Sequence, residues 1–341
     1  MNKIKNTLTT FFKKTPRGIH LFFHAYPTII SMMVLAISVA IFSFIIPEFR
    51  FLHPFNLSLI LQQVSLIGIL GVAQTLVILT AGIDLSVGAI MVLSSIVMGR
   101  MAMVYGLPDW AALSIGLGIG ALAGAINGFL VSRVKLPPFI VTLGTWSIFF
   151  ALNLWYSGSE THRSQDVAEV APLLQFLGTP LEFAGARFTY GSIAMVLLFF
   201  VFWYILKMTP WGRHVYATGD DPEAAELVGI NTSRVLLSVY TTAGLICGFA
   251  GWALIGRIGS ISPQAGQTGN LDSITAVVIG GISLFGGRGL IIGTLLGALV
   301  VGVFRNGLAI FGIDVLWQEF TVGILVILAV AIDQWARKVV S

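Results

Sequence analysis

Asp84 is the residue of greatest chemical interest, because it lies in the segment Thr80–Gly88 between two apolar runs. A carboxylate at the centre of a membrane helix costs roughly 2.5–3.5 kcal/mol on insertion scales. Gly82 and Gly88 flank Asp84 and permit a break in the chain. Asp84 either caps the helix that follows or forms an ion or proton site at a broken helix. We favour the cap, because a proton relay needs several acids and Glu319 is the only other one within an expected span.

A second segment, Gly219–Asn231, has the composition of a short helix with its own start and end signals. The residues that set its start, charge and end are, in order, Asp220 or Asp221, Pro222, Glu223, Glu226 and Gly229. An aspartate cap followed by proline begins a helix, acidic side chains suit its positive N-terminal end, and glycine ends it. A capped acidic helix between two spans predicts a docking element for a cytoplasmic partner, with a solvated connector as the alternative.

A third segment, Gly280–Gly289, is rich in glycine. Gly281 and Gly286 have the spacing of a phosphate-binding loop. Such a loop continues with Lys and then Ser or Thr, whereas Gly287 and Arg288 occupy those positions here. The segment therefore predicts a sharp turn between closely packed half-helices, and we exclude nucleotide binding by this chain.

Neutral polar side chains within the expected spans are candidates for a solute path. Amides and aromatics suit an uncharged, polyhydroxylated solute, and they also suit hydrogen bonds between helices. For each residue taken singly, the structural role is the better interpretation. The candidates for the path are Gln63, Gln74, Asn127, Thr142, Trp146, Asn153 and Asn306, and the same class includes Gln62, Thr145 and Gln318.

Nothing in the sequence predicts catalysis, a cofactor or a metal site. The five histidines are scattered, and the close pair His20 and His24 has no carboxylate or cysteine beside it. Cys247 is the only cysteine and lies in an apolar run, where it is expected to be a small buried hydrophobe. An intramembrane enzyme would need paired acids or a Ser/His constellation at depth, and we find neither.

The elements that must position these residues are membrane helices. The chain has 341 residues, of which 56% are hydrophobic and 10% charged, against about 25% charged in a typical soluble domain. This composition excludes a soluble enzyme, a disordered chain and a secreted disulfide scaffold. The net charge of +4 indicates basic loops that orient a membrane protein rather than nucleic-acid binding.

Stretches without charge predict an all-α polytopic protein with about ten spans, each needing roughly 20 residues. Ser273–Phe285 and Gly289–Phe304 are short, and they are candidates for half-helices or a re-entrant pair. The ten expected spans are Tyr26–Pro47, Phe55–Ala81, Leu85–Tyr105, Trp110–Ser132, Pro138–Tyr156, Phe188–Leu206, Val235–Gly256, Ser273–Phe285, Gly289–Phe304 and Val315–Ile332.

The distribution of Lys and Arg predicts the orientation. With the N-terminus inside, 13 of the 19 basic residues fall on the inner side and 6 on the outer side, as the positive-inside rule expects. We therefore expect a cytoplasmic basic head (1–25), one transmembrane domain (26–335) and a cytoplasmic tail (336–341). Within that domain, 208–234 is expected to be a cytoplasmic coupling loop and 157–187 a periplasmic loop.

Glycines recur every four residues in several spans, where small faces let helix backbones approach closely. The expected glycine faces are Gly116, Gly120, Gly124 and Gly128 on one helix, Gly244 and Gly248 on a second, and Gly289, Gly293 and Gly297 on a third.

Three of these segments, in this order, resemble the inner-membrane permeases of bacterial ABC importers for monosaccharides, the ribose/xylose/fructose group. Leu79–Gly88 resembles the signature of that family, and Val277–Gly289 is similar to its late glycine-rich turn. The ending Ala329–Lys338 looks closest to fructose-type members. The resemblance marks as structural motif residues Gly82, Asp84, Ser86, Gly88, Gly280, Gly281, Gly286, Gly287 and Arg288. It marks as ATPase-coupling residues Asp220, Asp221, Pro222, Glu223, Ala224, Ala225, Glu226, Gly229, Ile230 and Asn231.

The resemblance implies a mechanism in which the chain has no chemistry of its own. Two permease copies form a channel of type II-like fold in the cytoplasmic (inner) membrane. A periplasmic sugar-binding protein delivers the sugar, and a separate cytoplasmic ABC ATPase drives alternating access. The alternative is an ion-coupled secondary transporter of a small polar solute, in which Asp84 would be the coupling residue.

Overall fold

The structure is a computed structural model that describes residues 27–340, except Gln267. The expected basic head (1–25) lies outside the described residues. Within the described part, seven helices are long and apolar enough to cross a membrane, and three further apolar helices are shorter. The seven are α3 (Pro27–Ile45), α4 (Pro54–Leu79), α6 (Asp109–Ser132), α7 (Pro138–Ser157), α10 (Tyr190–Met208), α13 (Thr232–Ile258) and α15 (Ile291–Ile310). The shorter ones are α5 (Val87–Met103), α14 (Gly269–Ile279) and the apolar part of α16 (Val315–Val340). These helices confirm the prediction of an all-α polytopic membrane protein.

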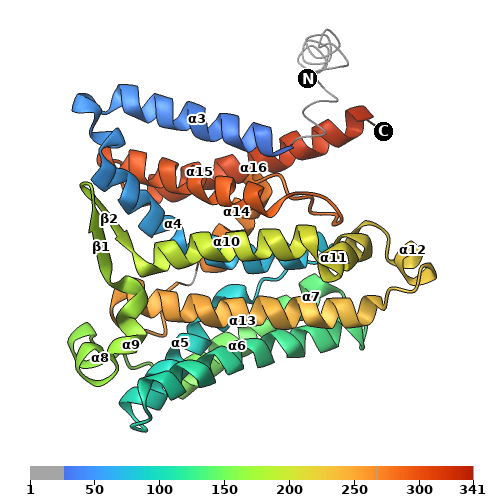
Figure 1. Ribbon diagram of the computed structural model, residues 1–341, viewed down its shortest axis with the longest axis horizontal. Coiled ribbons are helices and arrows are strands. Elements are labelled where there is room, and N and C mark those ends of the chain that lie inside the picture. Colours follow the sequence, from blue (N-terminus) through green and yellow to red (C-terminus); the bar gives the residue numbers. More distant parts are fainter. Residues whose placement is uncertain (1–26, 267, 341) are drawn as a thin grey trace.

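The helices lie side by side and nearly antiparallel, which gives the bundle two distinct ends (Figure 1). One end, called here the hairpin end, carries the antiparallel strands β1 (Pro180–Phe183) and β2 (Ala186–Thr189), with the short helices α8 (Ser164–Val170) and α9 (Pro172–Gln175). The other, called the α12 end, carries α11 (Pro210–Asp220) and α12 (Pro222–Leu227). Short 3₁₀ turns, η1 (Pro47–Leu52) and η2 (Phe176–Gly178), complete the hairpin end.

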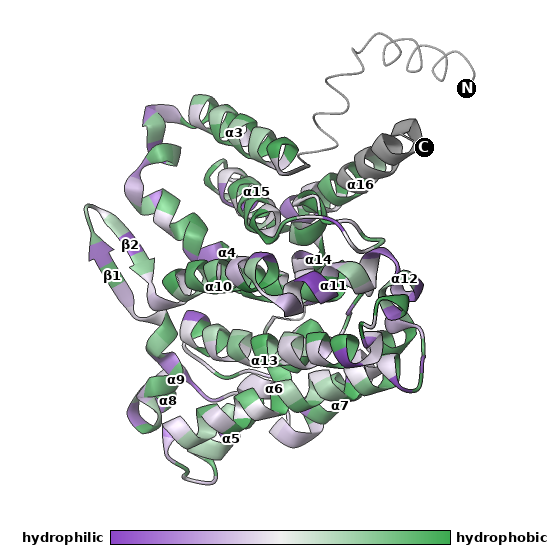
Figure 2. Cartoon of the chain, turned by 45° about the vertical axis from the view of Figure 1, so that its right-hand side comes forward, coloured by the Kyte–Doolittle hydropathy of each residue, from purple (hydrophilic) through white to green (hydrophobic). Residues whose placement is uncertain are grey.

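The surface agrees with a lipid environment along the sides of the bundle. Hydrophilic residues concentrate on α11, α12 and the strands, whereas the long helices are mainly hydrophobic (Figure 2). Helix α3 is the least covered by protein, with 17% of its apolar window buried, whereas 67% of the α4 window is buried. Helix α4 is therefore central, and α3 is peripheral.

Glycines account for the closest helix contacts, as predicted. A Cβ on Gly120 or Gly124 of α6 would overlap the backbone of Gly244 on α13. A Cβ on Gly297 would likewise overlap the backbone of α14. Gly289 is a correction, because it lies before the start of α15 with φ +121 and is not part of that helix face.

The two short spans differ from each other. Helix α14 has 11 residues, too few to cross a bilayer, which agrees with the half-helix interpretation. Helix α15 has 20 residues, so the half-helix interpretation is wrong for that span. Helix α14 also begins at Gly269, four residues before the expected start, and thereby brings Asp272 into a helix.

Candidate functional site

The α12 end presents a small helix built as its sequence predicts. The carboxylate of Asp221 accepts the backbone N–H of Ala224 at 3.0 Å, so Asp221 and not Asp220 is the cap. Pro222 stands at the first helical position, and Gly229 has the left-handed φ of +88 that ends the segment. Asn231 then caps α13 by accepting the N–H of Arg234 at 2.9 Å.

The tip of this helix exposes two large apolar side chains that pattern analysis missed. Leu227 is 88% exposed and Val228 is 77% exposed, whereas Ala225 is buried beneath them. The acidic side chains Glu223 and Glu226 are also exposed. The sequence did contain a signal for this exposure, because two adjacent apolar residues at the end of a short acidic helix have no core to pack into.

Helix α11, which leads into α12, is joined to the glycine-rich turn. The N–H of Gly287 donates to the carbonyl of Leu79 at 2.9 Å, and a Cβ on Gly219 would overlap that same carbonyl. The Tyr216 hydroxyl donates to the carbonyl of Gly289 at 2.8 Å. Burial raises the pKa of Tyr216 to about 12, so it stays a donor at physiological pH. Helix α11 is therefore in direct contact with both the turn and the end of α4.

Several positions in that turn have backbone conformations that favour glycine. Gly281, Gly286 and Gly287 all have positive φ, between +67 and +84, a region that residues with a Cβ rarely adopt. Gly280 has an ordinary φ, but its Cβ would overlap the backbone of Gly293. Arg288 lies beside Asp220 with 3.8 Å between Nε and Oδ1. The turn is sharp, as its composition predicts.

The interpretation of Asp84 as the helix cap is wrong, because Asp84 lies two residues before the cap and its carboxylate bonds that cap residue. Helix α5 begins at Val87 and its cap is Ser86, so Asp84 is not itself the cap residue. The carboxylate, 2% exposed, accepts the Ser86 N–H at 2.7 Å and the Ser86 hydroxyl at 2.6 Å. Asn127 also donates to the Ser86 hydroxyl, at 2.8 Å. These bonds hold the Asp84 segment in place between α4 and α5.

Three of the seven path candidates, Gln74, Asn127 and Thr142, meet at the segment Ile83–Ser86, whereas the other four lie elsewhere. Gln63 lines an open cleft at the hairpin end. The side-chain amide of Gln74, placed so that its N–H and its oxygen both find partners, bonds the carbonyl and the N–H of Asp84. The others make contacts within the bundle: Asn127 to Ser86, Thr142 to the Ile83 carbonyl, Asn153 to the Pro263 carbonyl, Asn306 to Asn56, and Trp146 stacked on Phe150. Their contact with solute stays a prediction.

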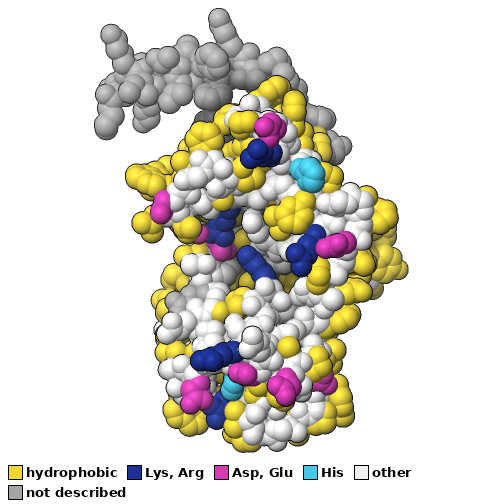
Figure 3. All heavy atoms as spheres, turned by 90° about the vertical axis from the view of Figure 1, so that its left-hand side faces the viewer, with side chains coloured by type: hydrophobic (Ala, Val, Ile, Leu, Met, Phe, Trp, Pro, Cys, Tyr) yellow, Lys and Arg dark blue, Asp and Glu magenta, His cyan; other side chains and the backbone are white. Residues whose placement is uncertain are grey.

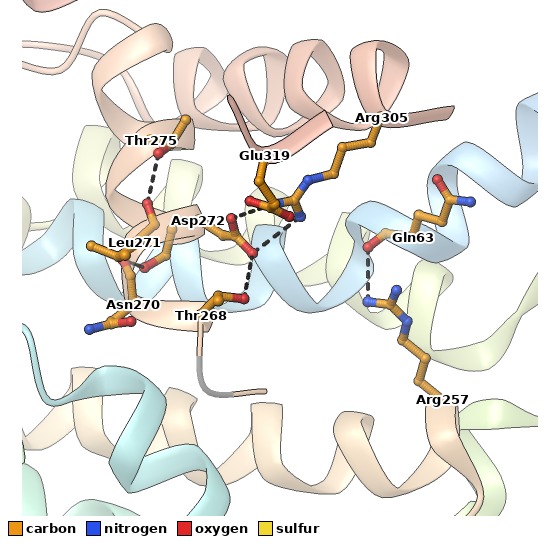
Figure 4. A network of polar contacts seen from close by, with 10 residues as sticks. Gln63, Arg257, Thr268, Asn270, Leu271, Asp272, Thr275, Arg305 and Glu319 are labelled. Atoms are coloured by element: carbon orange, nitrogen blue, oxygen red, sulfur yellow. Dashed lines mark hydrogen bonds and ion pairs between the residues drawn. The ribbon is translucent and has the colours of Figure 1, made fainter. Parts of the chain in front are cut away.

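The cleft at the hairpin end has a volume of about 400 Å³ and is lined by α4, α13, α14, α15 and α16. The face at that end shows basic side chains around a depression near its middle (Figure 3). Arg305 donates to Asp272 at 2.7 and 3.2 Å and to Glu319 at 2.9 and 3.0 Å (Figure 4). Arg257 reaches across from α13 to the Gln63 carbonyl at 3.1 Å.

Sequence reasoning missed this cluster. From the sequence, Arg257 and Arg305 mark only the outer side, and Glu319 is the one acid expected within a span besides Asp84. That expectation is wrong, because Asp272 lies in α14 and is 7% exposed. The available signal was Arg305, a basic residue inside the apolar helix α15, because such a residue usually pairs with a carboxylate.

Comparisons with known proteins extend over nearly the whole chain. The family described as branched-chain amino acid transport system / permease component matches residues 56–330. The chain is 58% identical to the fructose import permease FrcC of Rhizobium meliloti, over 94% of this chain and 89% of the relative. It is 40% identical to the ribose import permease RbsC of Bacillus subtilis, over 88% and 90%. It is 34% identical to the D-allose transport system permease AlsC of Escherichia coli, over 96% of each. No solved structure matches the chain.

Proposed function

The chain belongs to the family of branched-chain amino acid transport system permease components, and from this premise we propose that it is the permease subunit of an ATP-driven monosaccharide importer. The observation that carries the proposal is its similarity, over 88% of the chain or more, to three sugar permeases. The chain is a multi-pass protein of the bacterial cytoplasmic membrane. It hydrolyses nothing itself, and ATP is hydrolysed on a separate subunit.

Fructose is the proposed sugar. Identity falls from 58% with the fructose permease to 40% and 34% with the ribose and D-allose permeases. A periplasmic binding protein delivers the sugar, and two copies of this chain form the channel. These partners follow from the resemblance to sugar importers, and a homodimer is the simplest pairing for a chain with one permease domain.

The α12 end is the proposed cytoplasmic side. Three observations support this: the position there of the loop 208–234, which the distribution of Lys and Arg predicts to be cytoplasmic, the return of α16 to that end (Figure 1), and the exposed apolar tip of α12. The ATPase docks on Leu227 and Val228, and its closure pulls on α11. Because Gly219 and Tyr216 contact Leu79 and Gly289, that motion reaches both the α4–α5 break and the glycine-rich turn.

A purification experiment tests the function. The chain is extracted from native membranes in a mild detergent, its partners are identified by mass spectrometry, and ATPase activity is measured with sugar-loaded binding protein. We expect an ATPase and fructose-stimulated hydrolysis. If the chain purifies alone and reconstituted vesicles accumulate sugar along an ion gradient, the importer proposal fails and the secondary transporter replaces it.

The docking surface has its own test. We predict that Leu227→Ser with Val228→Ser reduces copurified ATPase at least tenfold, because each buried aliphatic side chain contributes roughly 1.5–3 kcal/mol. Thermal unfolding of the permease alone should not change, since both side chains are exposed. The matched control is Leu181→Ser with Phe183→Ser, which removes exposed apolar side chains from the opposite end. Equal ATPase recovery in both variants would contradict the docking assignment.

A further inference from the structure

The cleft at the hairpin end has the size and lining of a small-molecule site. Its volume of about 400 Å³ falls within the range of roughly 300–1,000 Å³ for ligand pockets. Polar and charged groups face it from several helices, and apolar side chains complete its walls. The lining residues used here are Gln63, Leu66, Leu254, Arg257, Asp272 and Arg305.

The charges around the cleft cancel. Arg305 is fixed between Asp272 of α14 and Glu319 of α16, so its guanidinium has a defined orientation. Arg257 adds a second positive charge on the opposite wall (Figure 4). Glu319 lies outside the lining but pairs with Arg305, and with it the two arginines and two carboxylates give a formal charge of zero, which favours a neutral ligand over an ionic one.

Arg257 differs from Arg305 in having donors to spare. Its one hydrogen bond in the described structure goes to the Gln63 carbonyl, and no carboxylate of the described residues lies within ion-pair distance. A guanidinium has five N–H donors in a planar fork. Its side chain is exposed within the cleft. The remaining N–H groups therefore have space in which to meet hydroxyl oxygens.

We propose that this cleft is a binding site for a neutral monosaccharide, in which Arg257 and the Asp272–Arg305 pair hydrogen-bond the sugar hydroxyls. A hydroxyl both donates and accepts, and these side chains supply N–H donors on one wall and carboxylate acceptors on the other. Leu66 and Leu254 supply apolar surface for the carbon-bound hydrogens of the ring. The inference rests on the proposed function, and it places a resting site for sugar within the permease, at the end opposite α12.

Direct binding tests the proposal. The purified permease in lipid nanodiscs is mixed with D-fructose, and saturation transfer from protein to sugar is recorded by NMR. We expect transfer with the unmodified chain, its loss in Arg257→Gln, and partial recovery in Arg257→Lys, which keeps the charge without the planar fork. Arg163→Gln is the control, because Arg163 is an exposed arginine of the same end that does not line the cleft.

Transport measurements separate this proposal from the proposed function. In proteoliposomes holding the whole importer, Arg257→Gln should reduce sugar uptake about tenfold or more, in line with hydrogen bonds to charged groups. Affinity for the binding protein should be unchanged. Normal uptake and normal saturation transfer in Arg257→Gln would overturn the site while leaving the function intact. A selective loss of binding-protein affinity would overturn it too, by assigning Arg257 to the protein partner. If the unmodified importer carries no monosaccharide, the function itself fails.

Discussion

The contact of α11 with the glycine-rich turn and the wall of the cleft join their helices in different ways. At the α12 end, backbone meets backbone, because Gly219 and Gly287 leave no side chain between α11, the glycine-rich turn and the end of α4. At the hairpin end, long charged side chains bridge the helices, with Arg305 between Asp272 and Glu319. The first arrangement leaves no room for side chains between the elements it joins. The second leaves an open cleft of about 400 Å³ between the helices.

This contrast predicts where substitutions are costly. Close packing tolerates no added methyl group, because neighbouring backbone must move to admit it. An ion pair beside a cleft tolerates changes of size, but it does not tolerate the loss of one partner, which leaves a charge without compensation. The stability of variants at each end therefore distinguishes contacts that depend on close packing from contacts that depend on ion pairs.

The largest effect is expected at Gly219. The change Gly219→Ala places a Cβ where the Leu79 carbonyl now lies, so α11 must separate from α4. We expect a loss of stability of about 3 kcal/mol, with much less folded protein in the membrane and little sugar-stimulated ATPase activity. The assays are membrane yield and thermal unfolding in detergent.

Gly144→Ala is the matched control for that change. Gly144 also lies within a helix, and nothing lies within 4 Å of where its Cβ would be. Alanine is the better helix former there, so stability should hold or rise slightly. Equal behaviour of the two variants would show that the contact with Leu79 is not tight.

Next in size is the loss of Arg305. Arg305→Ala leaves Asp272 with 11% of its side chain exposed and no cation partner, and we expect roughly 3 kcal/mol of destabilisation. Arg50→Ala removes a pair whose side chains are 70% and 71% exposed, and it should cost less than about 1 kcal/mol. The measurement is chemical unfolding of both variants in detergent. Similar unfolding midpoints would show that the Arg305 ion pairs contribute no more to stability than the exposed Arg50 pair.

Sequence reasoning succeeded where the controlling chemistry is local. An aspartate cap at Asp220 or Asp221 and the Gly229 end depend on residues within one turn, and the spans depend on runs of apolar residues, so these features were predictable. Asp272, Arg305 and Glu319 come from three helices and meet only through tertiary packing, which a single sequence does not display. The start of α14 was missed for a related reason, since its polar first turn faces the cleft rather than lipid.

The smallest effect tests the α12 end by changing one of two adjacent carboxylates. Asp221→Ala removes the cap of α12 and should cost about 1 kcal/mol of local helix stability, seen as faster amide exchange at Ala224 and weaker ATPase recovery. Asp220→Ala removes the same charge but only a 3.8 Å pair with Arg288, in which both side chains are more than 60% exposed. That pair should contribute well under about 1 kcal/mol. Because the change in net charge is identical, the difference between the variants isolates the cap. Matching exchange rates at Ala224 would mean that α12 is held by its contacts rather than by its own N-terminus.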